Sequence, residues 1–367
     1  MRIFILALLA ASICINANTQ TKESAQPSLR IMFWNTENFY DTHRDSLIDD
    51  KEFLPDGTRF WTPKRYKTKL MHAYKTIVAL GGWEPPDIIG LCEIENKRVL
   101  NDLLYQTPLG KFSYGIVHKD SPDKRGIDVA MLYRKDRFKI LLSKWIPVIF
   151  PDRPDEKTRD IVYVKGMVIH EQSKSPGRFD RRDSVIIIDT LHLFFNHWPS
   201  RSAGQMETDD KRWIAAKTLK SQIESILLMD RHARIFISGD FNDEPTDYSV
   251  AKGLGACSCL TTCDTCKLYN LSTQFPGNGQ MGTHKYQAEW AVLDQILVSG
   301  ELLLGNHGLH CTPPDAHIFN ADFLMVEDET GMGRKPFRTY DGYRYSGGFS
   351  DHLPVYLDLW LPPSSNP

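Results

Sequence analysis

Eight short apolar runs recur along the chain, separated by turn-forming or polar residues. The runs cover residues 29–34, 87–92, 127–133, 160–169, 184–195, 234–238, 292–298 and 354–359. Several are apolar at consecutive positions, so both faces of the strand would be buried. A sheet buried on both faces needs a covering layer on each side. The runs therefore predict an α+β fold in which two sheets pack against each other.

Two segments have the apolar spacing of an amphipathic helix. Residues 64–80 place Leu70, Ala73 and Ile77 on one stripe, and residues 207–229 carry a similar stripe. We expect these helices to cover the outer faces of the two sheets. Polar residues at the strand ends would then meet along one edge of the fold.

The N-terminal residues have the pattern of a secretory signal peptide, with Arg2, an apolar run over residues 3–15 and the small residue Ala17. We therefore expect a signal peptide at 1–17, a disordered lead-in at 18–28 and a single domain at 29–367, exported to the periplasm or secreted. The residues before Cys14 form a poor lipobox, which argues against a lipoprotein anchor. No other run approaches the roughly 20 apolar residues of a membrane helix. We expect a monomer without a membrane span.

The overall charge gives no support for a nucleic-acid-binding protein. Removing the signal peptide takes away Arg2 and no acid, which leaves 43 basic and 46 acidic residues. Local basic stretches exist around Lys69, around Arg181 and around Arg338, but such stretches are more often solvated faces than binding surfaces. We interpret them as solvated faces.

Four cysteines lie close together, at Cys257, Cys259, Cys263 and Cys266. In an oxidising compartment they would form one or two local disulfides. A structural zinc site is the alternative, but the spacing lacks the two separated knuckles of a zinc ribbon. Either interpretation makes the group structural rather than catalytic.

Polar residues that interrupt or end apolar strands are the candidates for chemistry, because a buried polar group must be paired or functional. Taken singly, each has a structural explanation: Asn35 could cap the chain, Glu93 could be a surface acid, and 239–242 could be a tight turn. Together they supply carboxylates, amides, imidazoles and arginines, without a paired serine or cysteine nucleophile. The candidates are Asn35, Glu37, Glu93, Arg125, Asn196, His197, Arg201, Asp240, Asn242, Asp294, Asp351 and His352.

This set of side chains suits metal-assisted attack on phosphorus. Glu93, Glu37 and Asp351 offer the hard oxygen ligands that Mg²⁺ prefers, and Mn²⁺ is the alternative metal. Imidazole and guanidinium groups can stabilise charge on phosphate oxygens in the transition state. Asp294, an acid inside an apolar strand, would hold His352 in one tautomer and raise its basicity.

The order of these motifs resembles the endonuclease/exonuclease/phosphatase superfamily, which includes deoxyribonuclease I, abasic-site endonucleases, neutral sphingomyelinases and inositol polyphosphate 5-phosphatases. The resemblance spans residues 31–361 and rests on Asn35 with Glu37, on Glu93, Asn196 with His197, residues 239–242, Asp294 and residues 350–352. It implies a deoxyribonuclease I-like, four-layer α/β/β/α sandwich of two mixed sheets flanked by helices, with the site at one rim.

The resemblance also implies roles for the candidates. Glu93 would be the main metal ligand, with Glu37 and Asp351 nearby. Asp240 and Asn242 would position or deprotonate the attacking water, His352 with Asp294 would form the family's His–Asp dyad, and His197 would donate to a phosphate oxygen. Whether Asp240 or His352 is the base stays open at this point. Arg125 would face the substrate, and Asn196 and Arg201 are further substrate-binding candidates.

Two departures from the family pattern concern the substrate. Glu37 stands where some members carry Asp, and His197 is followed by Trp-Pro-Ser-Arg instead of the Leu of several phosphatase branches. The loop 340–349, with Tyr343 and Tyr345, would either stack on a base or pack over the rim.

We therefore expect a metal-dependent phosphoesterase, with an extracytoplasmic nuclease as the first hypothesis. The alternatives are a phosphatase or phosphodiesterase of lipid headgroups or phosphorylated sugars, and a catalytically silent binding protein on the same fold.

Overall fold

The computed structural model describes residues 26–82, 84–172, 184–201, 204–258, 267–275, 281–304 and 307–362. The predicted signal peptide, and the lead-in up to residue 25, lie outside the described residues. So do Cys259, Cys263 and Cys266, which leaves the predicted cysteine pairing a prediction. Within these ranges no helix is both long enough and apolar enough to cross a membrane.

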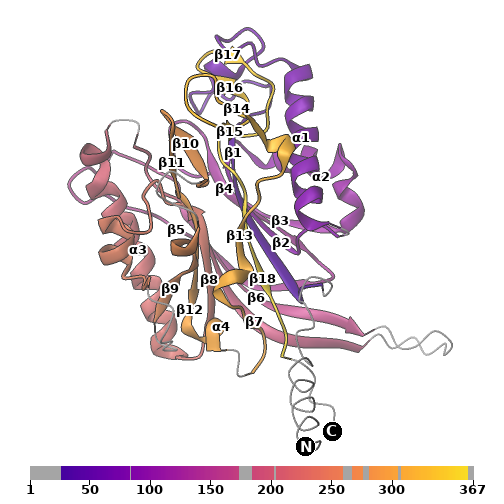
Figure 1. The fold of residues 1–367 in the computed structure, drawn as a ribbon, viewed down its shortest axis with the longest axis vertical. Coiled ribbons are helices and arrows are strands. Elements are labelled where there is room, and N and C mark those ends of the chain that lie inside the picture. The colour runs from indigo at the N-terminus through magenta and orange to yellow at the C-terminus, as the bar shows by residue number, and fades with distance from the viewer. Residues whose placement is uncertain are drawn as a thin grey trace, which may run out of the picture.

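Two six-stranded mixed sheets form the centre of the fold (Figure 1). The first has the order β13 (Ala316–Ile318), β18 (Val355–Leu359), β1 (Leu29–Phe39), β2 (Ile88–Ile94), β4 (Asp128–Arg134) and β3 (Tyr114–Val117). The second has the order β5 (Phe138–Ile146), β6 (Ile161–Gln172), β7 (Ser184–His197), β8 (Arg234–Asp240), β12 (Asp294–Ser299) and β9 (Leu268–Asn270). β1 runs parallel to β2 and β7 parallel to β8, whereas the other pairs are antiparallel. All eight predicted strands are present.

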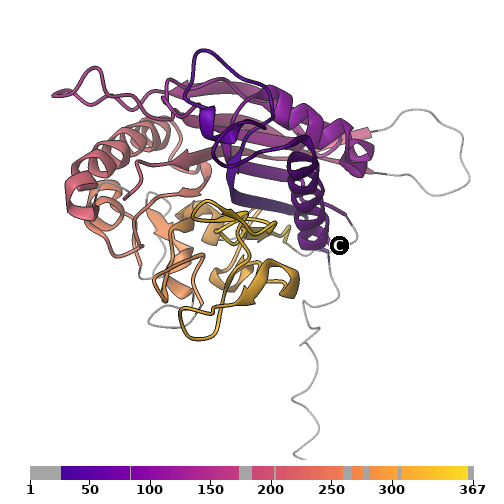
Figure 2. The same cartoon turned by 90° about the horizontal axis from the view of Figure 1, so that it is seen from above.

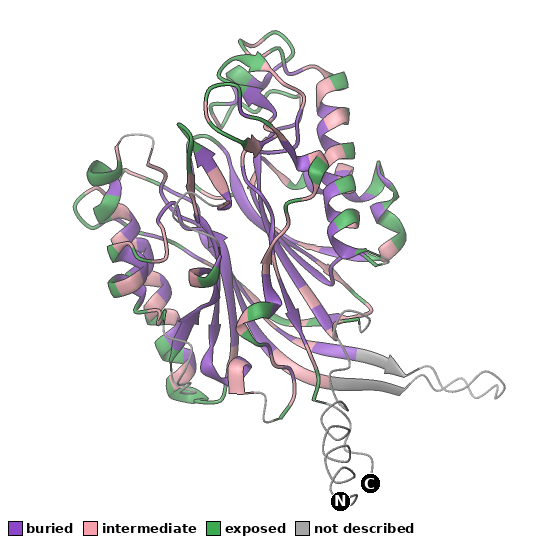
Figure 3. Ribbon diagram, viewed as in Figure 1, coloured by how far each residue is buried: buried purple, intermediate pink, exposed green. Residues whose placement is uncertain are grey.

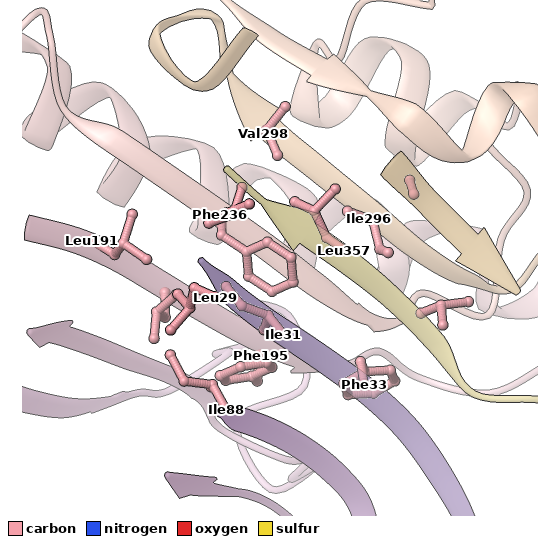
Figure 4. Packing of buried hydrophobic residues seen from close by; sticks show 14 of the residues in the cluster. Leu29, Ile31, Phe33, Ile88, Leu191, Phe195, Phe236, Ile296, Val298 and Leu357 are labelled. Atoms are coloured by element: carbon pink, nitrogen blue, oxygen red, sulfur yellow. The ribbon is translucent and has the colours of Figure 1, made fainter. Parts of the chain in front are cut away.

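The two sheets pack face to face through an apolar core (Figure 4). Phe33 of β1 stacks on Phe195 of β7, with ring centroids 6.4 Å apart. Ile31, Phe236 and Leu357 from both sheets are fully buried around them. Removing this apolar surface from water is the main force that holds the sheets together.

Helices cover the outer face of each sheet, which completes four layers (Figures 1 and 2). α1 (Pro63–Gly81) and α2 (Lys97–Tyr105) pack on the first sheet, and α3 (Gln205–Met229) with the short helix η4 (Ser249–Leu254) packs on the second. Exposed residues lie on the outer faces of these helices and in the loops, and most of the strands between the helices are buried (Figure 3). The predicted four-layer α/β/β/α sandwich is confirmed.

Three short hairpins stand near the rim at which β1 and β2 end. They are β10 (His284–Tyr286) with β11 (Glu289–Ala291), β14 (Met325–Glu327) with β15 (Arg334–Pro336), and β16 (Tyr340–Asp341) with β17 (Arg344–Tyr345). Short helices η2 (Lys51–Phe53), η3 (Pro108–Phe112), η5 (Leu271–Gln274), α4 (Gly300–Leu304), η6 (Pro313–Asp315) and η7 (Asp322–Leu324) join the larger elements. Tyr345 packs against Tyr340, and the Arg65 guanidinium of α1 lies over the Tyr345 ring. Of the two alternatives for this loop, the described contacts favour packing over the rim.

Gly90 lies in the interface between the two sheets. A Cβ atom built on Gly90 of β2 would lie 2.2 Å from the ring of Phe195 on the facing sheet. We expect Gly90→Ala to lower the free energy of unfolding by about 1–3 kcal/mol, because the ring has no space into which to move. Chemical denaturation measures the loss. Combining the change with Phe195→Leu should cost less than the sum of the two single changes, and additive costs would contradict this explanation.

Candidate active site

Strand pairing brings the predicted residues to one rim. β7 and β8 end together with His197 opposite Asp240, and Asp240 is in turn opposite Asp294 at the start of β12. The first sheet contributes Asn35 from β1, and the Asn35 side-chain amide donates to Asp240 Oδ2 at 3.0 Å. This hydrogen bond crosses from one sheet to the other, so the site is built at the junction of both.

The backbone is strained where the first sheet enters the site. Glu37, Asn38 and Glu93 have φ values of 53°, 51° and 59°, which residues other than glycine rarely adopt. Register shifts in β1 and β2 interrupt the regular strand pairing at the same residues. The Asn38 N–H consequently donates to Glu93 Oε2 at 2.7 Å. The strain fixes the Glu93 carboxylate at the rim.

Asp240 is the most central carboxylate of the site. Its Oδ1 accepts from the Asn242 N–H at 2.9 Å, while its Oδ2 lies 3.7 Å from His197 Nε2 and 3.8 Å from His352 Nε2. Burial raises the pKa of Asp240, and the nearby His352 opposes that rise. Asn242 is held at a φ of 51° by its own amide, which donates to the Trp198 carbonyl.

His352 and Asp294 form the predicted pair. The distance from His352 Nδ1 to Asp294 Oδ2 is 2.7 Å, and Asp294 is fully buried. Burial alone would lower the pKa of His352, but the Asp294 and Asp240 carboxylates outweigh it and raise this pKa well above its ordinary value. The two carboxylates therefore favour the protonated form of the imidazole.

His197 has the opposite electrostatic character. Burial, reinforced by Arg159 and Arg125, lowers the pKa of His197 well below its ordinary value. Its Nε2 lies 3.9 Å from Glu93 Oε1, and its buried Nδ1 has no hydrogen-bond partner among the described residues. A neutral imidazole between two carboxylates can donate one hydrogen bond without adding charge.

Glu37 and Asp351 lie in a second polar cluster, together with two cations. The backbone N–H groups of Thr339 and Tyr340 donate to the buried Glu37 carboxylate at 2.6 and 3.3 Å. Arg338 Nη2 donates to Asp351 Oδ2 at 2.8 Å, and buried Lys69 donates to Thr339 Oγ1 and to the Phe349 carbonyl. Against the effect of burial, His352 and Arg338 lower the pKa of Asp351 to about 2.

The donor set of the rim fits a divalent cation. Glu93 Oε1 lies 3.4 Å from Arg125 Nη2 and 3.9 Å from His197 Nε2, and a buried oxygen of Asp294 has no hydrogen-bond partner within the described ranges. Ligand atoms of Asp240, Asp294 and His352 lie within 4.8 Å of one another, as do those of His284, Asp351 and His352. Glu93 and Glu37 belong to neither group. Mg²⁺ and Mn²⁺ prefer carboxylate oxygens as ligands, so the carboxylates of the rim match either ion.

The three predicted substrate-binding residues differ in what they contact. Arg125 is 46% exposed beside Glu93. Asn196 is fully buried. Its Nδ2 donates to the Ser238 carbonyl, and its Oδ1 accepts from Trp198 Nε1. Arg201 donates to the Asn242 carbonyl and to Asp243 and Asp247. Of the three, Arg125 has the side chain most available to a substrate, whereas the other two hold the loops around Trp198 and Asn242.

Sequence reasoning missed four residues of the rim: Asn38, Lys69, His284 and Arg338. Lys69 and Arg338 belong to the basic stretches that were interpreted as solvated faces, yet Lys69 is 2% exposed. Its position four residues before Ala73, on the buried stripe of α1, is the signal that would have found it. His284 lies against His352 with ring centroids 4.6 Å apart, and no sequence pattern links the two.

Glu37 should make stability depend on pH. Burial and the nearby Asp351 raise the pKa of Glu37 to about 7, compared with about 4.3 in an unfolded chain. The folded state then binds this proton more tightly, so stability falls as pH rises from about 4.3 to 7. We expect wild type to lose a few kcal/mol relative to Glu37→Gln between pH 5 and 8, since one pKa unit corresponds to about 1.4 kcal/mol.

Urea denaturation at both pH values, in EDTA, measures this difference. Glu327→Gln is the matched control, because the Glu327 side chain is 82% exposed and should leave the pH dependence unchanged. An equal stability difference between wild type and Glu37→Gln at pH 5 and pH 8 would contradict the assignment.

Comparison with known proteins agrees with this fold. The model of the Endonuclease/Exonuclease/phosphatase family matches residues 30–360. A search of curated proteins gave no match. Among solved structures, a mannosyl-6-phosphatase of Bacteroides thetaiotaomicron is 16% identical, with a TM-score of 0.52 over 90% of this chain and 99% of that chain.

Two further solved structures have similar scores. An endonuclease/exonuclease/phosphatase family protein from Bacteroides thetaiotaomicron is 16% identical, with a TM-score of 0.52 over 92% of this chain and 97% of that chain. The human nocturnin catalytic domain, solved with a bound sulfate anion, is 16% identical, with a TM-score of 0.50 over 91% of this chain and 94% of that chain. At these identities the likeness shows the shared fold.

Proposed function

We propose, from the premise that this chain belongs to the endonuclease/exonuclease/phosphatase family, that it hydrolyses phosphate esters with a divalent metal ion. The observation that carries the proposal is the position of Asp240, between neutral His197 and the His352–Asp294 pair at the same rim as Glu93. A carboxylate that can accept a proton, a neutral imidazole and an imidazole that favours its protonated form lie together here. These groups suit attack of water on phosphorus.

Glu93, with Asp351 and Glu37 nearby, would hold Mg²⁺ or Mn²⁺, which polarises the phosphate and offsets its charge when bound. The protein supplies the rest. Asp240 would take a proton from the attacking water, because burial raises its pKa and its Oδ2 lies between the two imidazoles, while the Asp294 and Asp240 carboxylates favour the protonated form of His352. Asn35 and Asn242 fix the orientation of Asp240. The His352 cation and the His197 N–H stabilise charge on the phosphate oxygens.

For the substrate we propose phosphodiester bonds of nucleic acid, hydrolysed outside the cytoplasm. The motif order that includes deoxyribonuclease I supports the substrate, and the N-terminal residues 1–17 support export. The second candidate is a phosphomonoester of a sugar, which the mannosyl-6-phosphatase with the same fold favours. Both share one chemistry, in which water replaces the ester oxygen on phosphorus.

The test is an assay of the purified protein with plasmid DNA, RNA, sphingomyelin, inositol phosphates and mannose 6-phosphate. Each substrate is incubated with Mg²⁺, with Mn²⁺ and with EDTA. We expect turnover of at least one phosphate ester with metal and its loss in EDTA. Failure to turn over any ester, or equal rates in EDTA, would refute the proposed function. Cleavage of mannose 6-phosphate without cleavage of DNA or RNA would replace the first candidate by the second.

A further inference from the structure

We infer that Arg338 binds a non-bridging phosphate oxygen of the substrate, beside Asp351. The inference rests on the proposed function and deepens it by assigning a phosphate-binding residue outside the family motifs. Arg338 lies thirteen residues before Asp351, in the segment that enters β16.

The backbone around Arg338 is held firmly in place. The next two residues, Thr339 and Tyr340, donate their N–H groups to Glu37, while Lys69 donates to Thr339 Oγ1. The Arg338 carbonyl accepts from the Gly348 N–H, at 3.2 Å. Buried Lys69 of α1 and the strained end of β1 therefore fix the position of the backbone from which the Arg338 side chain extends.

The guanidinium itself is only partly satisfied by protein groups. Nη2 donates to Asp351, Nε lies 3.9 Å from Glu37 Oε1 without a hydrogen bond, and Nη1 makes no hydrogen bond to the part of the chain that the structure describes. The side chain is 33% exposed. A guanidinium has five N–H donors in a planar fork. Nε is buried, so the donors that remain for a ligand are those of Nη1 and the second N–H of Nη2.

A planar fork with free donors matches phosphate geometry better than any other side chain. Arg338 stands on the Asp351 side of the rim, and Arg125 stands on the Glu93 side, where its Nη2 lies 3.4 Å from Glu93. Two of the three carboxylates that are expected to hold the metal, Asp351 and Glu93, thus each have an arginine beside them.

A different role would be to hold Asp351 and nothing more. Arg338 would then change metal affinity and leave phosphate affinity untouched. The two roles are separable, because inorganic phosphate is a probe of the anion site and needs no turnover.

The first experiment measures binding of inorganic phosphate to the full-length protein in saturating Mg²⁺, by calorimetry, for wild type, Arg338→Gln and Arg338→Ala. We expect phosphate affinity to fall about 10- to 100-fold in both variants, the effect of losing hydrogen bonds to a charged group. The Mg²⁺ concentration for half-saturation should stay within about twofold of wild type. Arg344→Ala is the control, because Arg344 lies in the same loop, is 78% exposed and pairs only weakly with Asp341 at 3.8 Å.

The second experiment needs no variant. Phenylglyoxal modifies exposed guanidiniums, and mass spectrometry reports each arginine separately. We expect phosphate to protect Arg338 and to leave Arg344 reactive. Unchanged phosphate affinity in the variants, a shift in Mg²⁺ half-saturation in its place, or the absence of protection in wild type would overturn the inference. If phosphate binds through Arg338 but no ester is turned over, the proposed function fails and this inference stands.

Discussion

Replacing Asp240 by asparagine is expected to lower kcat by about a thousandfold or more on any phosphate ester that the protein hydrolyses. The amide keeps the shape of the side chain and can still contact Asn35 and Asn242, but it cannot accept a proton from water. The neighbouring His352 should not replace it, since the Asp294 carboxylate raises the pKa of the imidazole and favours its protonated form. KM should change much less than kcat, because the loss falls on the chemical step.

Steady-state kinetics with metal present measure this loss. Asp322→Asn is the matched control, because the Asp322 side chain is 98% exposed and its ion pair with Arg334 is worth little. Thermal unfolding should show both variants folded. A kcat for Asp240→Asn within tenfold of wild type would remove Asp240 from its role as base.

Asp294→Asn should have the second-largest effect, a fall in kcat/KM of about a hundredfold or more at neutral pH. Asp294 is fully buried, and its carboxylate is the main partner that keeps His352 charged. The amide removes that charge, so the His352 pKa should drop toward or below its ordinary value and the imidazole should become neutral. A neutral ring stabilises phosphate charge less than a cation does.

The same pair should contribute to the pH dependence of stability, in addition to Glu37. A histidine pKa that folding raises contributes stability that is complete below about pH 6.5 and is lost as pH rises through the folded-state pKa. Asp294→Asn should lose most of this contribution. Two measurements check both effects: NMR titration of the His352 ring, and the pH profile of kcat/KM. They are made on wild type, Asp294→Asn, His352→Gln and the double variant. Purely additive losses, or an unchanged His352 titration in Asp294→Asn, would show that the two residues act independently.

The strands and long helices were predictable because their side chains repeat with the period of the backbone. All eight strand predictions and both helix predictions are confirmed, with ends shifted by a few residues. Several elements were not predicted, among them the sheet strands β3, β5, β9 and β13 and the helix α2. β5 is an edge strand with exposed Leu141 and Leu142, so it lacks the apolar pattern of the inner strands. α2 is only nine residues long, which leaves too few turns to establish a period.

The sequence by itself determined which chemical groups could meet. Polar residues at the ends of buried strands must be paired or functional, and neighbouring strands of a sheet bring their ends to one rim. This physical rule was enough to bring together Asn35, Glu93, His197, Asp240 and Asp294. It holds because local apolar patterns fix the strands.

Only the tertiary structure decided the charge of each group and the partners that arrive from distant loops. His197 and His352 are the same residue type, yet burial leaves one neutral while two buried carboxylates keep the other charged. Arg338 and Lys69 looked like surface cations, and the packing of α1 against the segment before Asp351 brings them to the site. Electrostatic environment and long-range contacts depend on distances between groups far apart in the chain, which no local pattern encodes.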